Sequence, residues 1–245
     1  NQMRVKQEIV SSKISDFQIG ERTFENCRNL KSVSLPESLT EIYGGVFNSC
    51  KSLESIHLPR ELMIIGESAF ASCIALTQID IPENVSKLDD MAFSGCISLK
   101  SILLHNGLGK IGKNAFKDCK SLLEIFIPQS VHTMGTSPFR GCDTLAKIKV
   151  DIKSKHFKSV DDILFNKNKS ILICYPAEKD KYEYEVPDSV TIISDWAFCE
   201  CKKLSKITIP DSVYEIGEGA FYKCTGLKYL ELPDSVERID DTAFR

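Results

Sequence analysis

The fold is decided by residues 47–69, FNSCKSLESIHLPRELMIIGESA, because the pattern of this stretch begins again at Phe70 and recurs along the chain with the same period. A fixed period sustained over most of a chain is typical of solenoids and other repeat architectures. Each unit contains a phenylalanine that is followed three positions later by a cysteine. These pairs are Phe24/Cys27, Phe47/Cys50, Phe70/Cys73, Phe93/Cys96, Phe116/Cys119 and Phe139/Cys142, then Phe198/Cys201, Phe221/Cys224 and finally Phe244 alone.

Each unit contains two short extended segments. Ile56 and Leu58 alternate with polar neighbours, which predicts a strand with one buried face. Pro59 ends this strand because proline has no N–H to donate to a ladder. Ile65 points inward from a second extended piece, and residues 68–73 are predicted to form a single helical turn. One unit cannot bury this many apolar groups by itself, so the units must stack as coils of a solenoid.

The repeat resembles the BspA-like (Treponema pallidum type) leucine-rich repeats. The resemblance rests on Leu-x-x-Ile-x-Leu-Pro (Leu53–Pro59) and Ala-Phe-x-x-Cys (Ala69–Cys73), and it extends from about Ile19 to the end of the chain, apart from one divergent stretch. It implies an α/β repeat solenoid: a right-handed leucine-rich-repeat coil of about ten coils of 23 residues, with a parallel β-sheet on the concave side and irregular or single-turn helical segments on the convex side.

We expect one solenoid domain over residues 1–245, with a partial N-terminal coil or cap at residues 1–18. Residues 151–181 are expected to form a divergent coil, in which two apolar runs around the turn Asn166–Lys169 predict a β-hairpin insertion. The last coil is incomplete, since the chain stops at Arg245 where a cysteine and a leucine are expected, and we therefore expect the natural protein to continue.

The ten cysteines do not predict a disulfide framework. Eight of them share one inward position of the repeat, which favours small buried hydrophobic side chains. Cys199 falls where other coils carry Asn48 or Ser94, so we expect it to face solvent as a free thiol, and Cys174 lies in the predicted hairpin. Because no second cysteine pair accompanies Cys199 and Cys201 at a zinc-binding spacing, we expect no metal site.

Composition and motifs exclude several function classes. Lys and Arg number 31 against 34 Asp and Glu, so the chain has no basic surplus for a nucleic-acid backbone. The sequence contains no apolar run of about 18 residues, so no membrane span is expected in it. It also lacks a glycine-rich phosphate loop and a nucleophile elbow, so we expect neither a cofactor nor an enzyme. An unrecognised enzyme or metal protein stays an alternative, because catalytic groups assemble across a fold.

The side chains that flank the central isoleucine of each strand point away from the core, and in a solenoid this surface is where partners bind. Leu103 and Phe126 lie side by side on adjacent coils and form the predicted centre of a protein-binding site. Two alternatives are that the hairpin covers them, or that they are incidental exposed apolar residues. For the surrounding charges, the alternative is that Lys and Glu only pair across strands. The candidate binding residues are His57, Asp80, Leu103, His105, Phe126, Lys147, Lys149, Glu183 and Glu185.

The resemblance implies a non-enzymatic protein-interaction module of a cell-surface or secreted protein, which adheres to host or extracellular-matrix proteins or to other cells. An intracellular scaffold is the first alternative, because ten cysteines without evident bridges also suit a reducing compartment. A structural spacer whose active domain lies outside this sequence is the second.

Overall fold

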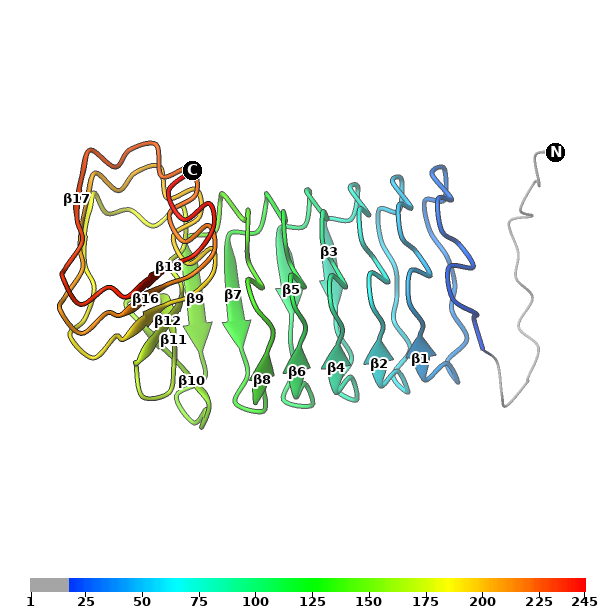
Figure 1. Cartoon of the computed structure of the whole chain (residues 1–245). Helices are drawn as coiled ribbons and strands as arrows, with labels where there is room; N and C mark the ends of the chain where they lie inside the picture. Colours follow the sequence, from blue (N-terminus) through cyan, green and yellow to red (C-terminus); the bar gives the residue numbers. More distant parts are fainter. Residues whose placement is uncertain (1–17) are drawn as a thin grey trace.

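The structure is a computed structural model that describes residues 18–245, a β-solenoid of about nine turns of about 23 residues. Figure 1 shows the turns stacked along one axis from the N-terminal side to β9, after which the axis changes direction. Apart from Gln18, the expected N-terminal coil or cap lies outside the described residues.

From the coil of Cys73 onward, the segment equivalent to Leu-x-x-Ile-x-Leu forms the first kind of strand. Residues 53–58, for which the alternation predicts a strand, do not form one. In these strands the central residue is buried or half-buried and its two neighbours are exposed, as the alternation predicts. They pair in parallel, each residue with its equivalent one coil later, as in Gln78↔Ser101. The strands are β3 (Gln78–Asp80), β5 (Ser101–Leu103), β7 (Glu124–Ile127), β9 (Lys147–Val150), β13 (Glu183–Glu185), β15 (Lys206–Thr208) and β17 (Tyr229–Glu231).

The second extended piece of each coil forms a parallel ladder in each stack, one from β1 to β8 and one from β14 to β18. Gly66, which follows β2, lies so close to the preceding coil that an added Cβ would meet the Ile42 carbonyl oxygen at 2.9 Å. The strands are β1 (Glu41–Ile42), β2 (Ile64–Ile65), β4 (Lys87–Leu88), β6 (Lys110–Ile111), β8 (Thr133–Met134), β14 (Ile192–Ile193), β16 (Glu215–Ile216) and β18 (Arg238–Ile239).

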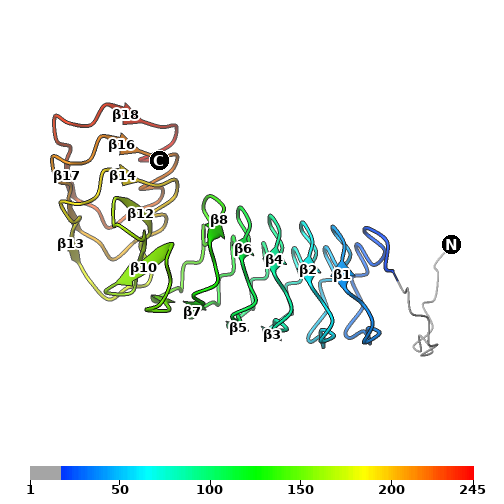
Figure 2. The same ribbon diagram turned by 90° about the horizontal axis from the view of Figure 1, so that it is seen from below.

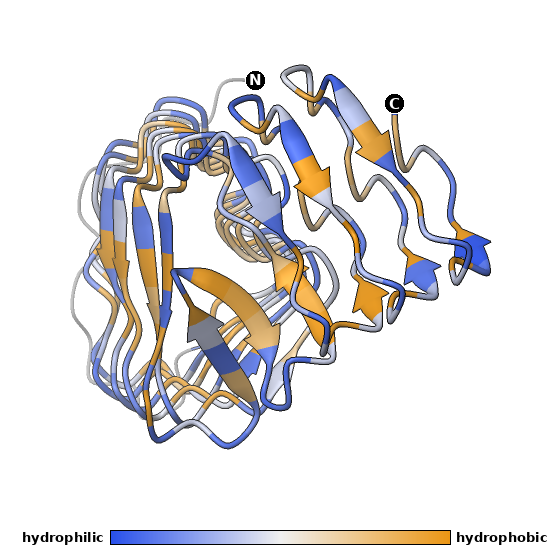
Figure 3. Ribbon diagram, turned by 90° about the vertical axis from the view of Figure 1, so that its left-hand side faces the viewer, coloured by the Kyte–Doolittle hydropathy of each residue, from blue (hydrophilic) through white to orange (hydrophobic). Residues whose placement is uncertain are grey.

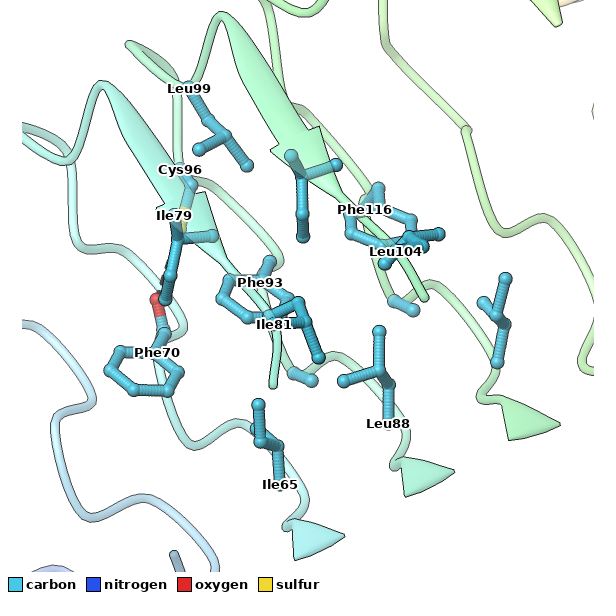
Figure 4. Close-up of a cluster of buried hydrophobic side chains, with 14 of the residues drawn as sticks. Ile65, Phe70, Ile79, Ile81, Leu88, Phe93, Cys96, Leu99, Leu104 and Phe116 are labelled. Carbon is cyan, nitrogen blue, oxygen red and sulfur yellow. Dashed lines mark hydrogen bonds between the residues drawn. The ribbon is translucent and has the colours of Figure 1, made fainter. Parts of the chain in front are cut away.

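The phenylalanines of successive coils stack into a continuous column between the two ladders. From Phe24 to Phe139, neighbouring ring centroids lie 5.2 to 5.8 Å apart, with the rings nearly parallel. Figure 4 shows Phe70, Phe93 and Phe116 in this column, with the aliphatic side chains of the strands packed around them. The fixed period of the sequence therefore becomes a fixed ring spacing in the core.

The segment around each phenylalanine is a turn, and residues 18–245 contain no helix. The α/β label is therefore imprecise, and the predicted helical turn at residues 68–73 is wrong. Ser68 and Ser72 both have positive φ, which a right-handed helix does not accommodate. The N–H groups of Ser68, Phe70 and Ser72 instead donate to carbonyl oxygens of the next coil, at 2.7 to 2.9 Å.

The repeated cysteines are buried thiols, as the repeat predicts, with only Cys27 and Cys224 at the ends partly exposed. Each thiol lies under the phenylalanine of the preceding coil: Cys73 donates to the Phe47 carbonyl oxygen at 3.2 Å and Cys96 to that of Phe70 at 3.1 Å. Burial raises the pKa of Cys96 to about 12. All ten cysteines are free in the structure.

A second stack begins at Tyr175, which takes the phenylalanine position one period before Phe198. The rings of Tyr175, Phe198, Phe221 and Phe244 follow one another with centroids 5.1 to 5.2 Å apart. The first stack (residues 18–150) and the second stack (residues 175–245) have separate hydrophobic cores. Figure 2 shows the second stack turning away from the side that carries β3, β5 and β7, so these strands lie on the outside of the bend.

Three antiparallel strands, here called the insert, separate the two stacks: β10 (Phe157–Val160), β11 (Ile163–Asn166) and β12 (Ile171–Cys174). The predicted hairpin is thus confirmed as β11 and β12, and β10 adds a third strand. Leu164 packs into the core of the first stack, whereas Ile163 and Phe165 on either side of it pack into the core of the second. Both faces of β11 are therefore buried, which explains its unbroken apolar sequence.

The bend also buries the position of Cys199, so the prediction that this residue faces solvent is wrong: it is 8% exposed. The coil of Phe139 lies against the coil of Phe198 at this point. The Arg140 guanidinium stacks 3.2 Å above the Trp196 ring, and Ser137 donates to the Asp195 carbonyl oxygen at 3.4 Å. A position that faces solvent in a straight solenoid is covered where the axis changes direction.

Phe93→Ala should lower the free energy of unfolding by about 3–5 kcal/mol, because it leaves a cavity between two rings that cannot close over it. Leu103→Ala, at a half-exposed position, should change it by less than about 0.5 kcal/mol. Urea denaturation of both variants checks this, and equal effects would contradict the role of the ring column.

Alkaline pH should destabilise the protein through the buried thiols. Unfolded cysteines titrate near 9.0, whereas burial raises the pKa of Cys50 and Cys96 to about 12. The unfolded chain therefore releases protons first, and the free energy of unfolding should fall as the pH rises from 9 toward 12. Each such thiol contributes at most about 1.4 kcal/mol per pH unit. Denaturation curves at increasing pH measure the slope, which should be smaller for Cys96→Ala; an unchanged slope would contradict this origin.

Candidate functional site

The strand face is the surface formed by the outward side chains of β3, β5, β7 and β9. Figure 3 shows apolar and polar residues interleaved along the strands, and the central residue of each of these four strands is buried. Leu103 on β5 and Phe126 on β7 interrupt this pattern, since they point outward and are 53% and 48% exposed. Two adjacent strands therefore place large apolar side chains at equivalent positions on the surface.

Charged groups border this apolar pair along the ladder. Asp80 is the register partner of Leu103 on one side, and Lys149 is the partner of Phe126 on the other. The His105 Nε2 atom lies 3.0 Å from the Asp80 carboxylate, and the Lys149 ammonium group lies 3.9 Å from a carboxylate oxygen of Glu124. The side chains of Asp80, Lys149 and Glu124 stay largely in contact with solvent, whereas that of His105 is mostly covered. Together they form a polar rim around an apolar centre.

The structure brings only part of the predicted set together. Lys147 and Lys149 both lie on β9, whereas Glu183 and Glu185 belong to β13 in the second stack, where Glu183 pairs with Lys206. His57 is on the coil before β3 and lies 3.9 Å from Glu37, with most of its side chain exposed. Glu183 and Glu185 therefore belong to a separate ladder, not to the rim around Leu103 and Phe126.

The alternative that the insert covers the apolar pair is wrong. The insert contacts β9 through β10 and β11, and its two faces pack into the two cores. Leu103 and Phe126 remain half-exposed. The pairing of Lys149 with Glu124 agrees with the other alternative for the charges, cross-strand pairing.

Leu123, which immediately precedes β7, is a further exposed apolar residue (58% exposed) that the strand alternation did not single out. Alternation places it inward, two positions before Ile125, but Leu122 takes the inward position instead. An alignment of the coils would have shown that Leu123 faces outward, because it is the equivalent of the polar residues Glu54 and Lys100.

The acidic pair Asp161 and Asp162 forms a tight turn between β10 and β11, and both residues have positive φ. The ammonium group of the buried Lys179 lies 3.2 Å from Asp161 and 4.0 Å from Asp162. Hydrogen bonding to Lys181 and Lys179 lowers the pKa of Asp161. The pair thus carries ion pairs that fasten the insert to the coil after it.

Within residues 18–245, no three metal-ligating side chains are grouped as a cation site requires. The same part of the chain contains no helix with the length and apolar character needed to cross a bilayer.

The family model for the BspA type leucine-rich repeat region matches residues 6–122, 42–172 and 177–245, with six copies in total. No curated protein sequence matches the chain. Leucine-rich-repeat proteins are commonly protein-interaction modules and are generally non-enzymatic.

Several solved structures are similar. A pneumococcal vaccine antigen, PcpA, shares 28% identity with a TM-score of 0.79, over 84% of this chain and 51% of that one. A leucine-rich cell surface protein from Faecalibacterium prausnitzii shares 28% identity with a TM-score of 0.73, over 91% of this chain and 73% of that one. The T. pallidum leucine-rich repeat protein shares 26% identity with a TM-score of 0.53, over 81% and 78%. The chain spans about half the length of the pneumococcal structure. With its repeats matched along almost the whole sequence, the chain belongs to the BspA type leucine-rich repeat family.

Proposed function

We propose that this chain is the adhesive part of a cell-surface or secreted protein and that it binds a host, matrix or cell-surface protein through the strand face. The observation that carries the proposal is the exposed pair Leu103 and Phe126 on adjacent strands, inside a rim of charged side chains. Two similar structures support the location, since one is named a vaccine antigen and the other a cell surface protein.

The mechanism is binding by a rigid preformed surface. The strands under Leu103 and Phe126 are held in register by parallel pairing and by the ring column behind them. A partner that covers the two side chains removes apolar surface from water without first ordering a loop, which lowers the entropic cost of binding. Asp80 and Lys149, with opposite charges on either side, favour one orientation of the partner.

An intracellular scaffold is the second candidate, and the ten free cysteines favour it. Their burial also keeps thiols reduced in an oxidising compartment, because a disulfide needs an accessible thiolate. Counting thiols after unfolding, in the protein purified from its natural host, tests the scaffold in one direction: disulfides among the ten would demand export, whereas ten free thiols agree with both candidates.

The double variant Leu103→Glu/Phe126→Lys should lose binding to a protein partner while keeping the parent's melting temperature. Both side chains are half-exposed, so charged replacements disturb the interface and not the core. The measurement is saturable binding of parent and variant to a panel of immobilised matrix glycoproteins and to whole cells. Tyr229→Lys, an exposed position on β17 in the second stack, is the matched control and should bind as the parent does.

Unchanged binding by the double variant would move the binding surface away from the strand face. Absence of binding by the parent to every matrix protein and cell type would contradict the adhesion proposal and favour the scaffold or the structural spacer.

A further inference from the structure

The bend leaves one edge of a parallel sheet open, because the five-stranded sheet ends on β8. One coil earlier, the Gly109 carbonyl oxygen accepts the His132 N–H at 2.9 Å, and the Ile111 carbonyl oxygen accepts the Gly135 N–H at 2.8 Å. In the following coil, the equivalent acceptors are the carbonyl oxygens of His132 and Met134. Within residues 18–245, neither of these carbonyl oxygens receives a backbone N–H from a following coil. The next coil is displaced by the insert, so β8 keeps a row of acceptors for another strand.

A cavity of about 340 Å³ adjoins this edge. Residues 134–137 form one wall, and Phe157, Ile171, Ile173 and Ile192 supply an apolar floor from the insert and β14. Figure 2 shows the angle between the two stacks, with β8 on one side and β12 and β14 on the other. The volume lies within the range of roughly 300–1,000 Å³ of typical ligand pockets.

Carboxylates line the far side of the same cavity. Asp195 accepts the Glu218 N–H at 3.0 Å through one carboxylate oxygen, and Glu215 lies 3.4 Å from an Arg238 guanidinium nitrogen. Arg238 also makes two hydrogen bonds to Asp240, so its charge is shared between two carboxylates. The cavity therefore has a net acidic rim, which favours a cationic group on whatever binds there.

We propose that the bend is a second binding site, which accepts an extended segment of a partner protein as an added β-strand on β8. The backbone N–H groups of the segment bond to the His132 and Met134 carbonyl oxygens, one of its apolar side chains covers Ile171 and Ile192, and a lysine or arginine meets the acidic rim. An extended peptide fits better than a small apolar molecule, because it uses the open edge, the floor and the carboxylates together.

The first probe is a synthetic peptide with the sequence of residues 106–113, which includes β6. In the chain, β6 pairs with the edge of β8 that faces away from the cavity. In the chain itself, the Gly112 N–H of this sequence donates to the Leu88 carbonyl oxygen of the preceding coil at 2.8 Å. On β8, the same N–H would meet the Met134 carbonyl oxygen. The N–H of Ile111 points to the opposite edge, because successive N–H groups of a strand alternate in direction.

N-methylation therefore distinguishes strand addition from other binding. The peptide methylated at the nitrogen of Gly112 should lose about tenfold or more in affinity for the 245-residue chain, as expected when a hydrogen bond is removed and its acceptor left unpaired. The peptide methylated at the nitrogen of Ile111 should bind as the unmodified peptide does. Nuclear magnetic resonance titration measures all three affinities.

A pair of protein variants tests the location. Ile192→Lys removes part of the floor and places a cation beside the lysine of the peptide, and it should weaken binding about tenfold or more. Ile64→Lys makes the same change at the equivalent position of β2, away from the cavity, and should bind as the parent does. Both should fold, because Lys87 and Lys110 occupy this position in β4 and β6.

Loss with Gly112 methylation and with Ile192→Lys, together with the two unchanged controls, supports the proposal. Absence of saturable binding up to about 1 mM peptide would overturn it, and so would equal binding by the two methylated peptides. Loss with Ile192→Lys but indifference to both methylations would show that the peptide occupies the cavity through its side chains alone, and would overturn strand addition. The Leu103→Glu/Phe126→Lys variant should bind the peptide as the parent does, so this result is independent of the strand-face proposal.

Discussion

Hydrogen bonding from each coil to the next, in a register of one full repeat, is the constraint on which the rest of the molecule depends. It places each phenylalanine on the one before it, and it requires residues of positive φ on both sides of the ring, so that their N–H groups point along the axis. It also places each thiol under a phenylalanine carbonyl oxygen of the preceding coil, which accepts the S–H in addition to a backbone N–H. Ladders, ring column and thiols therefore form one interdependent system.

The register explains how much of the fold the sequence predicts. A residue such as Leu53 or Cys96 has the same surroundings in every coil, so periodicity alone assigns its burial. The outward direction of Leu103 and Phe126 follows in the same way from strand alternation. The burial of Cys199 could not be predicted from periodicity, because it depends on contact between two coils that would not be neighbours in a straight stack. The prediction of a helical turn was wrong because a spacing of three positions also fits a turn whose N–H groups donate to carbonyl oxygens of the next coil.

The start of the second ring stack at Tyr175 was not predicted, because the residue at this position of the repeat is not a phenylalanine. Tyr175 stands one period before Phe198 and continues the same ring stacking, yet a tyrosine with its hydroxyl group replaces the pattern's phenylalanine. Of the two proposed binding surfaces, only the strand face can be predicted from the sequence, because it depends on the pattern within single coils. The cavity beside β8 could not be predicted, because it forms only where the insert changes the direction of the second stack.

The insert has a consequence for how such a protein changes during evolution. Duplication or deletion of one repeat unit lengthens or shortens a stack without disturbing its packing, because every unit offers the same upper and lower surface. The insert interrupts this equivalence, since its faces fit two different cores. Array length can therefore drift on either side while the angle between the stacks, and the cavity within it, is inherited unchanged.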